Sequence, residues 1–280
     1  MTLKNNREIK VLVKYIILLI LIALSQCSKE NNREDKISIK GSTTLLPIVF
    51  RATEVFMQQN NISITISATG SGNGIKGLID GICDIASTSR ALNDKELALA
   101  KQKKMNIEEI VIAYDMIIII VHPSNKIENL TLKELHNIYS GKITNWSQLG
   151  SVDNKIVVIS RDNSSGTYGI WNKMVIKEDK IVRKAVRVAA NSAMVYTVSS
   201  TPGAIGYIGL GYLNNSVKAL KLNSIEPELK NGMSGKYPIS RKLYMIIDKK
   251  NASEEITSFI DFMFSEKGQR TVKEAGFIPL

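Results

Sequence analysis

Hydrophobic residues along the chain fall into short runs that alternate with segments of helical spacing. The short runs are rich in Ile and Val, and several are apolar on both faces. They predict strands over 37–42, 62–69, 107–114, 116–123, 155–160, 204–210 and 243–249. Continuous Ile/Val runs of this kind suit parallel strands that helices cover on both sides.

The intervening segments carry apolar residues at the three- and four-residue spacing of amphipathic helices. They predict helices over 47–60, 73–81, 93–104, 131–140, 166–176 and 253–276. Asn93, with Glu96 three residues later, has the arrangement of a capping box. Alternating β and α elements predict an α/β fold with mainly parallel sheets. Since no Pro- or Ser-rich linker divides the chain, two lobes would have to share strands, and 114–123 and 235–245 are the candidate crossings.

The N-terminal segment has the layout of a secretory signal. Basic residues precede an apolar run that is shorter than the roughly 20 residues of a membrane span, and small or polar residues then lead to Cys27. Cys27 in this position resembles the lipidated cysteine of a bacterial lipobox, although Gln26 replaces the usual small residue. We therefore predict a signal peptide over 1–26 and a lipidated N-terminus and tether over 27–36, with an uncleaved N-terminal anchor as the alternative. Both place the rest of the chain outside the cytoplasmic membrane.

Composition and charge exclude several classes of function. The formal net charge is +11, spread along the chain without a dense basic run, which favours attraction of anions over nucleic-acid binding. Besides Cys27 there is only Cys83, interpreted as a small buried hydrophobe, so no disulfide framework is predicted. The two histidines, His122 and His136, lack metal-ligand spacing. No metal or cofactor is expected, and a histidine-dependent triad has little support.

Four segments share one design, in which a strand ends, a Gly/Ser/Thr turn follows and a helix begins. They are 39–47, 67–77, 84–92 and 159–169. The N-terminus of a helix presents unsatisfied N–H groups and a positive dipole end, so each turn is a potential anion site. A single such turn is usually an ordinary helix start. Four in one α/β chain would be brought together if the strands ended at one sheet edge.

The fourth turn, "SRDNSSGTYG", adds a cation to these donors. The planar fork of Arg161 can bind an oxyanion through two hydrogen bonds, and Ser165, Gly166 and Thr167 supply N–H and hydroxyl donors beside it. The alternative for Arg161 is a salt bridge, for which Asp162 is available. We interpret the turn as a binding site for an oxyanion.

Nucleotide-binding motifs are formally matched but fail in context. Residues 72–77, "GNGIKG", fit G-x-G-x-x-G, yet the acidic residue about 20 positions later, Asp94, lies at a predicted helix start and not at the end of the next strand. The lysines of 139–144 and 232–238 have no Ser or Thr directly after them, so neither is a Walker A loop. Nucleotide hydrolysis is not expected.

Taken in order, the motifs resemble those of the periplasmic phosphate-binding proteins of bacterial phosphate ABC transporters, the PstS type. The resemblance runs from about residue 37 to the C-terminus through "GSTTLLPI", "ATGSGNGI", "DIASTSRAL", "HNIYSGKITNWSQLG", "SRDNSSGTYG", "TPGAIGYIGLGYL", "YPISRKLYMI" and "GFIPL". It implies a type II periplasmic binding protein fold, with two α/β lobes joined by two crossing strands and the ligand cleft between them. Lobe 1 would be 37–114 plus 238–280, and lobe 2 would be 115–237.

The resemblance also implies a set of phosphate ligands. Thr43 would contribute its hydroxyl and Thr44 mainly its backbone N–H. The full set carried over to this chain is Thr43, Thr44, Ser71, Ser89, Arg161, Ser165, Gly166 and Thr167.

Ser89 marks a departure from the family pattern, because well-known members have an aspartate there that accepts the proton of hydrogen phosphate. Arg90 adds a cation nearby, and Asp115 on the predicted crossing strand is the candidate for the missing proton acceptor; either residue could instead support the ligand residues without touching the anion. The alternative for Asp115 is a hinge hydrogen bond or a salt bridge with Arg90. Asn163 also replaces an acidic residue of the family, so Asp162 is expected to hold Arg161 instead.

The implied function is binding without chemistry. A monomeric lipoprotein on the periplasmic side of the cytoplasmic membrane would capture inorganic phosphate and deliver it to the ABC permease. Three alternatives stay open: a binder of sulfate, molybdate or tungstate, a secreted phosphatase or serine hydrolase, and a surface adhesin or signalling lipoprotein. Trp146 either touches the permease from a surface loop or packs beneath the helix after Thr131.

Overall fold

A mixed sheet of nine strands runs through both lobes of residues 36–280, the part of the chain that this computed structural model describes. The strand order is β2-β1-β3-β11-β4-β8-β6-β7, with β9 beside β4. The strands are β1 (Lys36–Gly41), β2 (Ser63–Ala68), β3 (Ile85–Thr88), β4 (Ile107–Val121), β6 (Val157–Arg161), β7 (Val186–Val188), β8 (Ala204–Gly209), β9 (Lys218–Ala219) and β11 (Ser240–Asp248). A second small sheet pairs β5 (Asn129–Leu130) with β10 (Lys221–Leu222).

The N-terminal predictions lie outside the described residues. They concern the signal peptide, Cys27 and the tether up to residue 35. Within residues 36–280, no helix combines the length and apolar character needed to cross a membrane.

Parallel pairs in the large sheet lie toward its two ends, one set in each lobe, so the sheet is mixed and the expectation of mainly parallel sheets is corrected. In lobe 1, β1 pairs in parallel with β2 and β3. In lobe 2, β6 pairs in parallel with β7 and β8. The pairs β3–β11, β11–β4 and β4–β8 are antiparallel. The antiparallel strands therefore occupy the middle of the sheet, where the two lobes meet.

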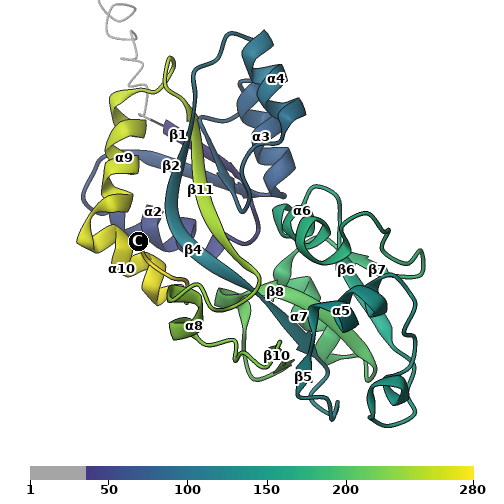
Figure 1. Ribbon diagram of the computed structural model, residues 1–280. Helices are drawn as coiled ribbons and strands as arrows, with labels where there is room; N and C mark the ends of the chain where they lie inside the picture. Colours follow the sequence, from purple (N-terminus) through teal and green to yellow (C-terminus); the bar gives the residue numbers. More distant parts are fainter. Residues whose placement is uncertain (1–35) are drawn as a thin grey trace, which may run out of the picture. The chain divides into compact units, whose positions relative to one another are not determined.

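One long strand, β4, connects the lobes, although the sequence predicted two strands over 107–114 and 116–123. Its first half pairs with β11 and its second half with β8, so the same strand belongs to both lobes (Figure 1). The second crossing begins where Ser240 of β11 lies opposite Met116. The expected crossings over 114–123 and 235–245 are confirmed.

Helices cover the sheet in each lobe, and most begin where the sequence predicted. They are α2 (Leu46–Met57), α3 (Ser71–Ile79), α4 (Asp94–Gln102), α5 (Leu132–Tyr139), α6 (Gly166–Trp171), α7 (Asn191–Ser199), α8 (Leu229–Met233), α9 (Glu254–Phe264) and α10 (Glu266–Glu274). The short 3-10 helices are η1 (Trp146–Leu149) and η3 (Leu210–Tyr212), and η2 (Asn172–Ile176) is a π-helix that continues α6.

Three details of the helices bear on the predictions. The capping box of Asn93 and Glu96 is present at the start of α4. The segment 253–276 forms two helices instead of one, because Ser265 leaves the helical conformation and caps α10 through its side chain. Helix α7 was not predicted.

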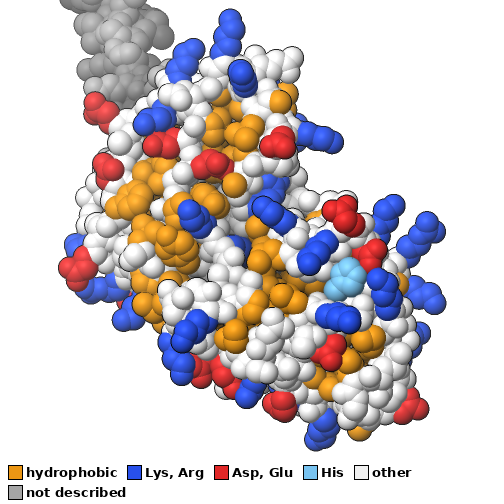
Figure 2. Space-filling view, viewed as in Figure 1, with side chains coloured by type: hydrophobic (Ala, Val, Ile, Leu, Met, Phe, Trp, Pro, Cys, Tyr) orange, Lys and Arg blue, Asp and Glu red, His pale blue; other side chains and the backbone are white. Residues whose placement is uncertain are grey.

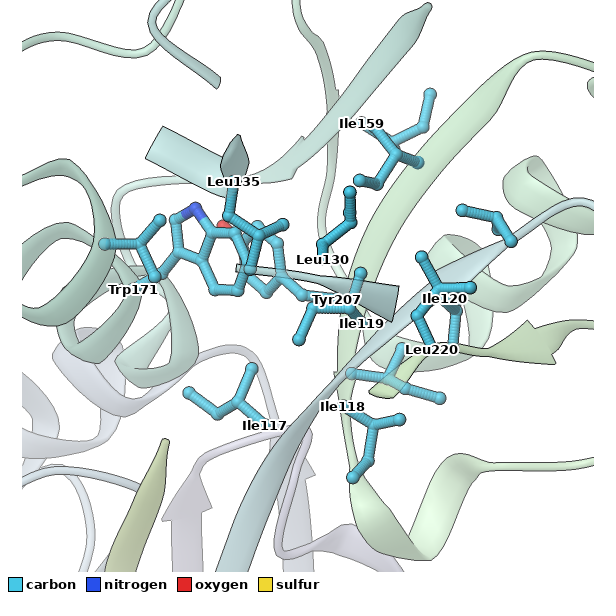
Figure 3. Close-up of a cluster of buried hydrophobic side chains, with 14 of the residues drawn as sticks. Ile117, Ile118, Ile119, Ile120, Leu130, Leu135, Ile159, Trp171, Tyr207 and Leu220 are labelled. Carbon is cyan, nitrogen blue, oxygen red and sulfur yellow. The ribbon is translucent and has the colours of Figure 1, made fainter. Parts of the chain in front are cut away.

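Each lobe has its own hydrophobic core, and the core of lobe 2 is built around β4 (Figure 3). Residues 117–120 of β4 are all isoleucine and all fully buried, because helices or strands cover both faces. Trp171 of α6 stacks on Tyr207 of β8 with ring centroids 4.0 Å apart. Trp146 is also buried and donates its Nε1–H to the carbonyl of Gly203. Of the two interpretations of Trp146, this supports packing inside the lobe and not contact with the permease. Cys83 is buried, as predicted.

Ile119 tests how much the shared strand contributes to stability. Truncation to Ala should lower the free energy of unfolding by about 2–5 kcal/mol, because it removes buried methyl groups and leaves a cavity, whereas Ile119→Val should cost about 0.5–1.5 kcal/mol. Ile82→Ala is the control, since Ile82 is 64% exposed and its truncation should change stability by less than about 0.5 kcal/mol. Urea unfolding measures all three, and equal effects for Ile119→Ala and Ile82→Ala would contradict the assigned packing.

Candidate oxyanion-binding site

The four Gly/Ser/Thr turns converge at the junction of the lobes. Ser71 Oγ lies 3.3 Å from Ser89 Oγ, which in turn lies 3.2 Å from Ser42 Oγ. Across the junction, Thr44 Oγ1 lies 3.1 Å from Thr167 Oγ1. All of these side chains are buried. The prediction that the strand ends would bring the turns together is confirmed.

The parallel pairing inside each lobe explains this convergence. Since β1, β2 and β3 run in the same direction, their carboxyl ends and the following turns share one edge of lobe 1. The turn after β2 requires a glycine: Gly70 has a φ of 108°, and a Cβ there would lie 2.4 Å from Ser164 Oγ of lobe 2. The backbone of Gly72 also contacts lobe 2, because its N–H donates to the Ser164 carbonyl at 2.9 Å.

Gly166 makes a close contact between the lobes. A Cβ at this position would lie 2.4 Å from Ser71 Oγ and 2.5 Å from Ser89 Oγ. The first turn of α6 can therefore approach the two serines only because Gly166 has no side chain. The neighbouring Ser165 caps α6 by accepting a hydrogen bond from the N–H of Tyr168, which leaves its own hydroxyl hydrogen available.

Arg161 brings a buried positive charge to the same place. It is 1% exposed, its Nε donates to the carbonyl of Val188, and its Nη2 donates to the carbonyl of Ala189 and to Thr43 Oγ1 at 3.0 Å. Its Nη1 is buried and has no hydrogen-bond partner within residues 36–280. Burial lowers the pKa of Arg161, because the charged form loses its hydration.

The expected partner of Arg161, Asp162, does not hold it. Asp162 Oδ1 instead accepts hydrogen bonds from the N–H and the hydroxyl of Ser164, at 2.8 and 2.5 Å. In the described part of the chain, Arg161 forms no salt bridge. A buried arginine with a free N–H and no carboxylate beside it is an incomplete ion pair, and an anion would complete it.

Asp115 pairs with Arg241 and not with Arg90, which was the partner in the alternative salt-bridge interpretation. Asp115 Oδ2 accepts from Arg241 Nε at 2.9 Å and from Nη2 at 2.6 Å, while Oδ1 accepts from the N–H of Leu210 at 2.9 Å. Burial raises the pKa of Asp115, and the Arg241 guanidinium opposes that shift. Arg90 is bound instead by Glu96, with both contacts at 2.7 Å. Both oxygens of Asp115 are thus occupied, which favours its salt-bridge role over that of a proton acceptor.

Two residues of the cluster were missed by the sequence analysis. Arg241 lies in the crossing segment, whose pattern was noted for topology and not for binding. Asn191, at the start of α7, is fully buried and donates from Nδ2 to Thr44 Oγ1 at 3.1 Å. The sequence "ANSAMVY" around Asn191 offers no recognisable signal, because only the tertiary structure brings α7 to Thr44.

In residues 36–280, both histidines form their hydrogen bonds outside the cluster of hydroxyl and N–H donors. Nucleophilic catalysis by a serine requires an adjacent base. His122 bonds to Ser124, and His136 bonds to the Val175 carbonyl and to Asp179, so both histidines are engaged elsewhere. Within residues 36–280, no group of three His, Cys, Asp or Glu residues could hold a metal ion. The arrangement suits the binding of a tetrahedral oxyanion.

Known proteins with similar sequences include proteins that bind an oxyanion. Residues 28–267 match a family model described as the PBP superfamily domain. The chain is 37% identical over 283 residues to the phosphate-binding protein PstS of Borreliella burgdorferi, an alignment that covers 95% of this chain and 98% of that protein.

Two solved structures are similar in fold and in sequence. One is the crystal structure of a putative phosphate ABC transporter substrate-binding protein with bound phosphate from Clostridium perfringens, with a TM-score of 0.83, 34% identity, and coverage of 88% of this chain and 99% of that chain. The other is an ABC-type phosphate transport receptor from Vibrio cholerae, with a TM-score of 0.73, 32% identity, and coverage of 87% and 100%.

Gly166→Ala tests whether the close contact sets the separation of the lobes. The added methyl group would overlap two serine hydroxyls, so the contact should lose about 1–3 kcal/mol and the lobes should separate. Gly72→Ala is the matched control, because a Cβ there meets its nearest atom at 3.4 Å. Small-angle X-ray scattering should give a larger radius of gyration for Gly166→Ala alone. Identical scattering from the two variants would contradict the assigned contact.

Proposed function

The chain belongs to the PstS-type phosphate-binding proteins of the PBP superfamily, and on that basis we propose that it captures inorganic phosphate between its lobes and delivers it to an ABC permease. The observation that carries the proposal is the buried Nη1 of Arg161, which has no partner within residues 36–280. A buried charged donor left unpaired is costly, and a phosphate oxygen would complete its hydrogen bonding.

The proposed ligands come from both lobes. Lobe 1 supplies hydroxyl and N–H donors from three turns, and lobe 2 supplies the arginine and the start of α6. The set is Thr43, Thr44, Ser71, Ser89, Arg161, Ser165, Gly166 and Thr167. The contacts of Arg161 with Thr43 and of Thr44 with Thr167 support this set, because they place donors of opposite lobes around one point.

Capture would proceed by closure of the lobes around the anion. An open form admits phosphate to one lobe, and closure adds the donors of the other and replaces the water of the ion. The shared strand β4 and the paired β11 supply the connection about which such closure can occur. We place the lobe boundaries near 114/115 and 237/238, which the separate hydrophobic cores support.

The proposed action is binding and delivery without chemical change of the ligand. The phosphate-binding relatives support this reading. Lys and Arg side chains are distributed over both lobes in Figure 2. Without the predicted signal peptide, which carries four basic residues and one acidic residue, the net charge is +8, and it would draw anions toward the protein. We further propose that the protein acts as a monomer at the outer side of the cytoplasmic membrane.

Ser89, which replaces a carboxylate, supports a second candidate function. This function is the binding of another tetrahedral oxyanion such as sulfate, molybdate or tungstate. A carboxylate facing the ligand would repel a fully ionised dianion, because the carboxylate cannot donate a hydrogen bond to it. Ser89 can both donate and accept, and the oxygens of Asp115 are already bound by Arg241 and Leu210. Sulfate is therefore the competitor to measure against phosphate.

Arg161→Gln should weaken phosphate binding by at least about 100-fold, because the charge and two hydrogen bonds to the anion are lost. Arg183→Gln is the matched control, since Arg183 lies on the surface of the same lobe, and it should bind as the wild type does. Isothermal titration with phosphate and with sulfate measures both variants. The proposed function fails if the folded wild-type protein binds no phosphate, and the second candidate replaces it if sulfate binds more tightly.

The proposed lipid anchor rests on the signal-like N-terminus and Cys27. Cys27→Ala should abolish incorporation of radiolabelled palmitate in a bacterial host and should release the protein from the membrane fraction. Cys83→Ala is the control, because Cys83 is buried in lobe 1 and should leave labelling unchanged. Equal labelling of the wild type and Cys27→Ala would exclude the anchor.

A further inference from the structure

We infer that Arg241, held by Asp115, is a positioning residue that fixes the direction of the Thr44 hydroxyl and makes the hydroxyl of Thr167 a hydrogen-bond donor toward the anion. This inference rests on the proposed function, since it concerns the same site. Arg241 lies on β11 directly opposite Asp115 on β4, so the pair joins the two crossing strands.

The two buried arginines of the site differ in what they contact. Arg161 has one nitrogen, Nη1, without a partner in the described part of the chain. In Arg241, every side-chain nitrogen has a partner. Nε and Nη2 donate to Asp115, and Nη1 donates to Thr167 Oγ1 at 2.9 Å. Nη2 also contacts Thr44 Oγ1 at 3.4 Å. Arg161 is therefore free to bind an anion directly, while Arg241 is committed to the side chains around it.

The hydroxyl of Thr44 has no remaining capacity to accept. A hydroxyl oxygen can accept two hydrogen bonds and donate one. Thr44 Oγ1 accepts from Asn191 Nδ2 at 3.1 Å and from Arg241 Nη2 at 3.4 Å. In its 3.1 Å contact with Thr167 Oγ1, Thr44 must consequently be the donor.

The hydroxyl of Thr167 is then also filled as an acceptor. It receives one hydrogen bond from Arg241 and one from Thr44. Within residues 36–280, its own hydrogen has no acceptor. That hydrogen remains available for a phosphate oxygen, so Arg241 determines the direction in which the hydroxyl points without touching the ligand.

A glycine beside the pair allows this arrangement. A Cβ at Gly209 would lie 2.8 Å from Asp115 Oδ2 and 3.3 Å from Arg241 Nη2. Because residue 209 has no side chain, there is room for the ion pair, and Arg241 can contact Thr44 of lobe 1 and Thr167 of lobe 2. Arg241 thus contacts hydroxyls of both lobes and favours the arrangement in which they meet.

A double-mutant cycle separates this role from a merely structural one. The ion pair is removed as a unit, by Asp115→Asn with Arg241→Met, so that no lone charge stays buried. Thr167→Val is then made in the wild type and in this background, and phosphate affinity is measured by isothermal titration. In the wild type, Thr167→Val should weaken binding roughly 10- to 100-fold, as expected for one hydrogen bond to a charged ligand.

In the background without the ion pair, the same substitution should weaken binding by less than about threefold, because Thr167 can then donate to Thr44 instead of the anion. An equal effect of Thr167→Val in both backgrounds would overturn the inference. Thr53→Val is the control, since the buried Thr53 hydroxyl donates to the Phe50 carbonyl in α2, and it should leave affinity unchanged in both.

Folding is checked by circular dichroism before titration. If the variant without the ion pair does not fold, Asp115→Asn with Arg241→Gln replaces it, because the two amides can hydrogen-bond to each other without a buried charge. The expectation for Thr167→Val is the same. Failure of the wild type to bind phosphate would refute the proposed function. Tight wild-type binding with an additive cycle would refute only the role of Arg241.

Discussion

The buried charge of Arg161 is the constraint on which the rest of the site depends. A guanidinium that is 1% exposed must be satisfied by hydrogen bonds, and the chain provides them with the backbone carbonyls of Val188 and Ala189 at the end of β7 and with Thr43 of the opposite lobe. None of these neutral groups cancels the charge. The fold therefore holds a cation at the junction of two lobes and supplies the remaining surroundings as hydroxyl and N–H donors, an environment that only an anion completes.

The same junction explains why the site needs small residues. Gly70 and Gly166 allow backbone of one lobe to approach serine side chains of the other, and Gly209 makes room for the ion pair of Asp115 and Arg241. In the proposed site, the atoms that form the contact between the lobes are consequently also those that would bind the anion. A ligand that bridges the hydroxyls of both lobes stabilises the closed arrangement by its differential affinity for it.

The sequence was sufficient to find the turns and the lobes, because both leave local patterns. Small polar residues after apolar runs identified the four turns, and the absence of a linker identified the crossings. Strand direction was predicted poorly, since pairing of β11 with β3 and β4 depends on contacts more than 100 residues apart. Asn191, and the pairing of Asp115 with Arg241 in place of Arg90, are likewise set by tertiary structure and leave no periodic signal.

The position of β11 between β3 and β4 has a consequence for how the chain acquires its structure. With the lobe boundaries proposed above, most of lobe 2 comes from one stretch of the chain, 115–237, and that stretch can begin to assemble before the residues after it have been made. Lobe 1 lacks its strand β11 until residues 240–248 have been synthesised. Until then, β3 has no partner strand along one of its edges, so lobe 1 cannot be completed before almost the whole chain has been made. The lobe encoded first is therefore the lobe completed last, and the oxyanion site, which needs both, is the final product of folding.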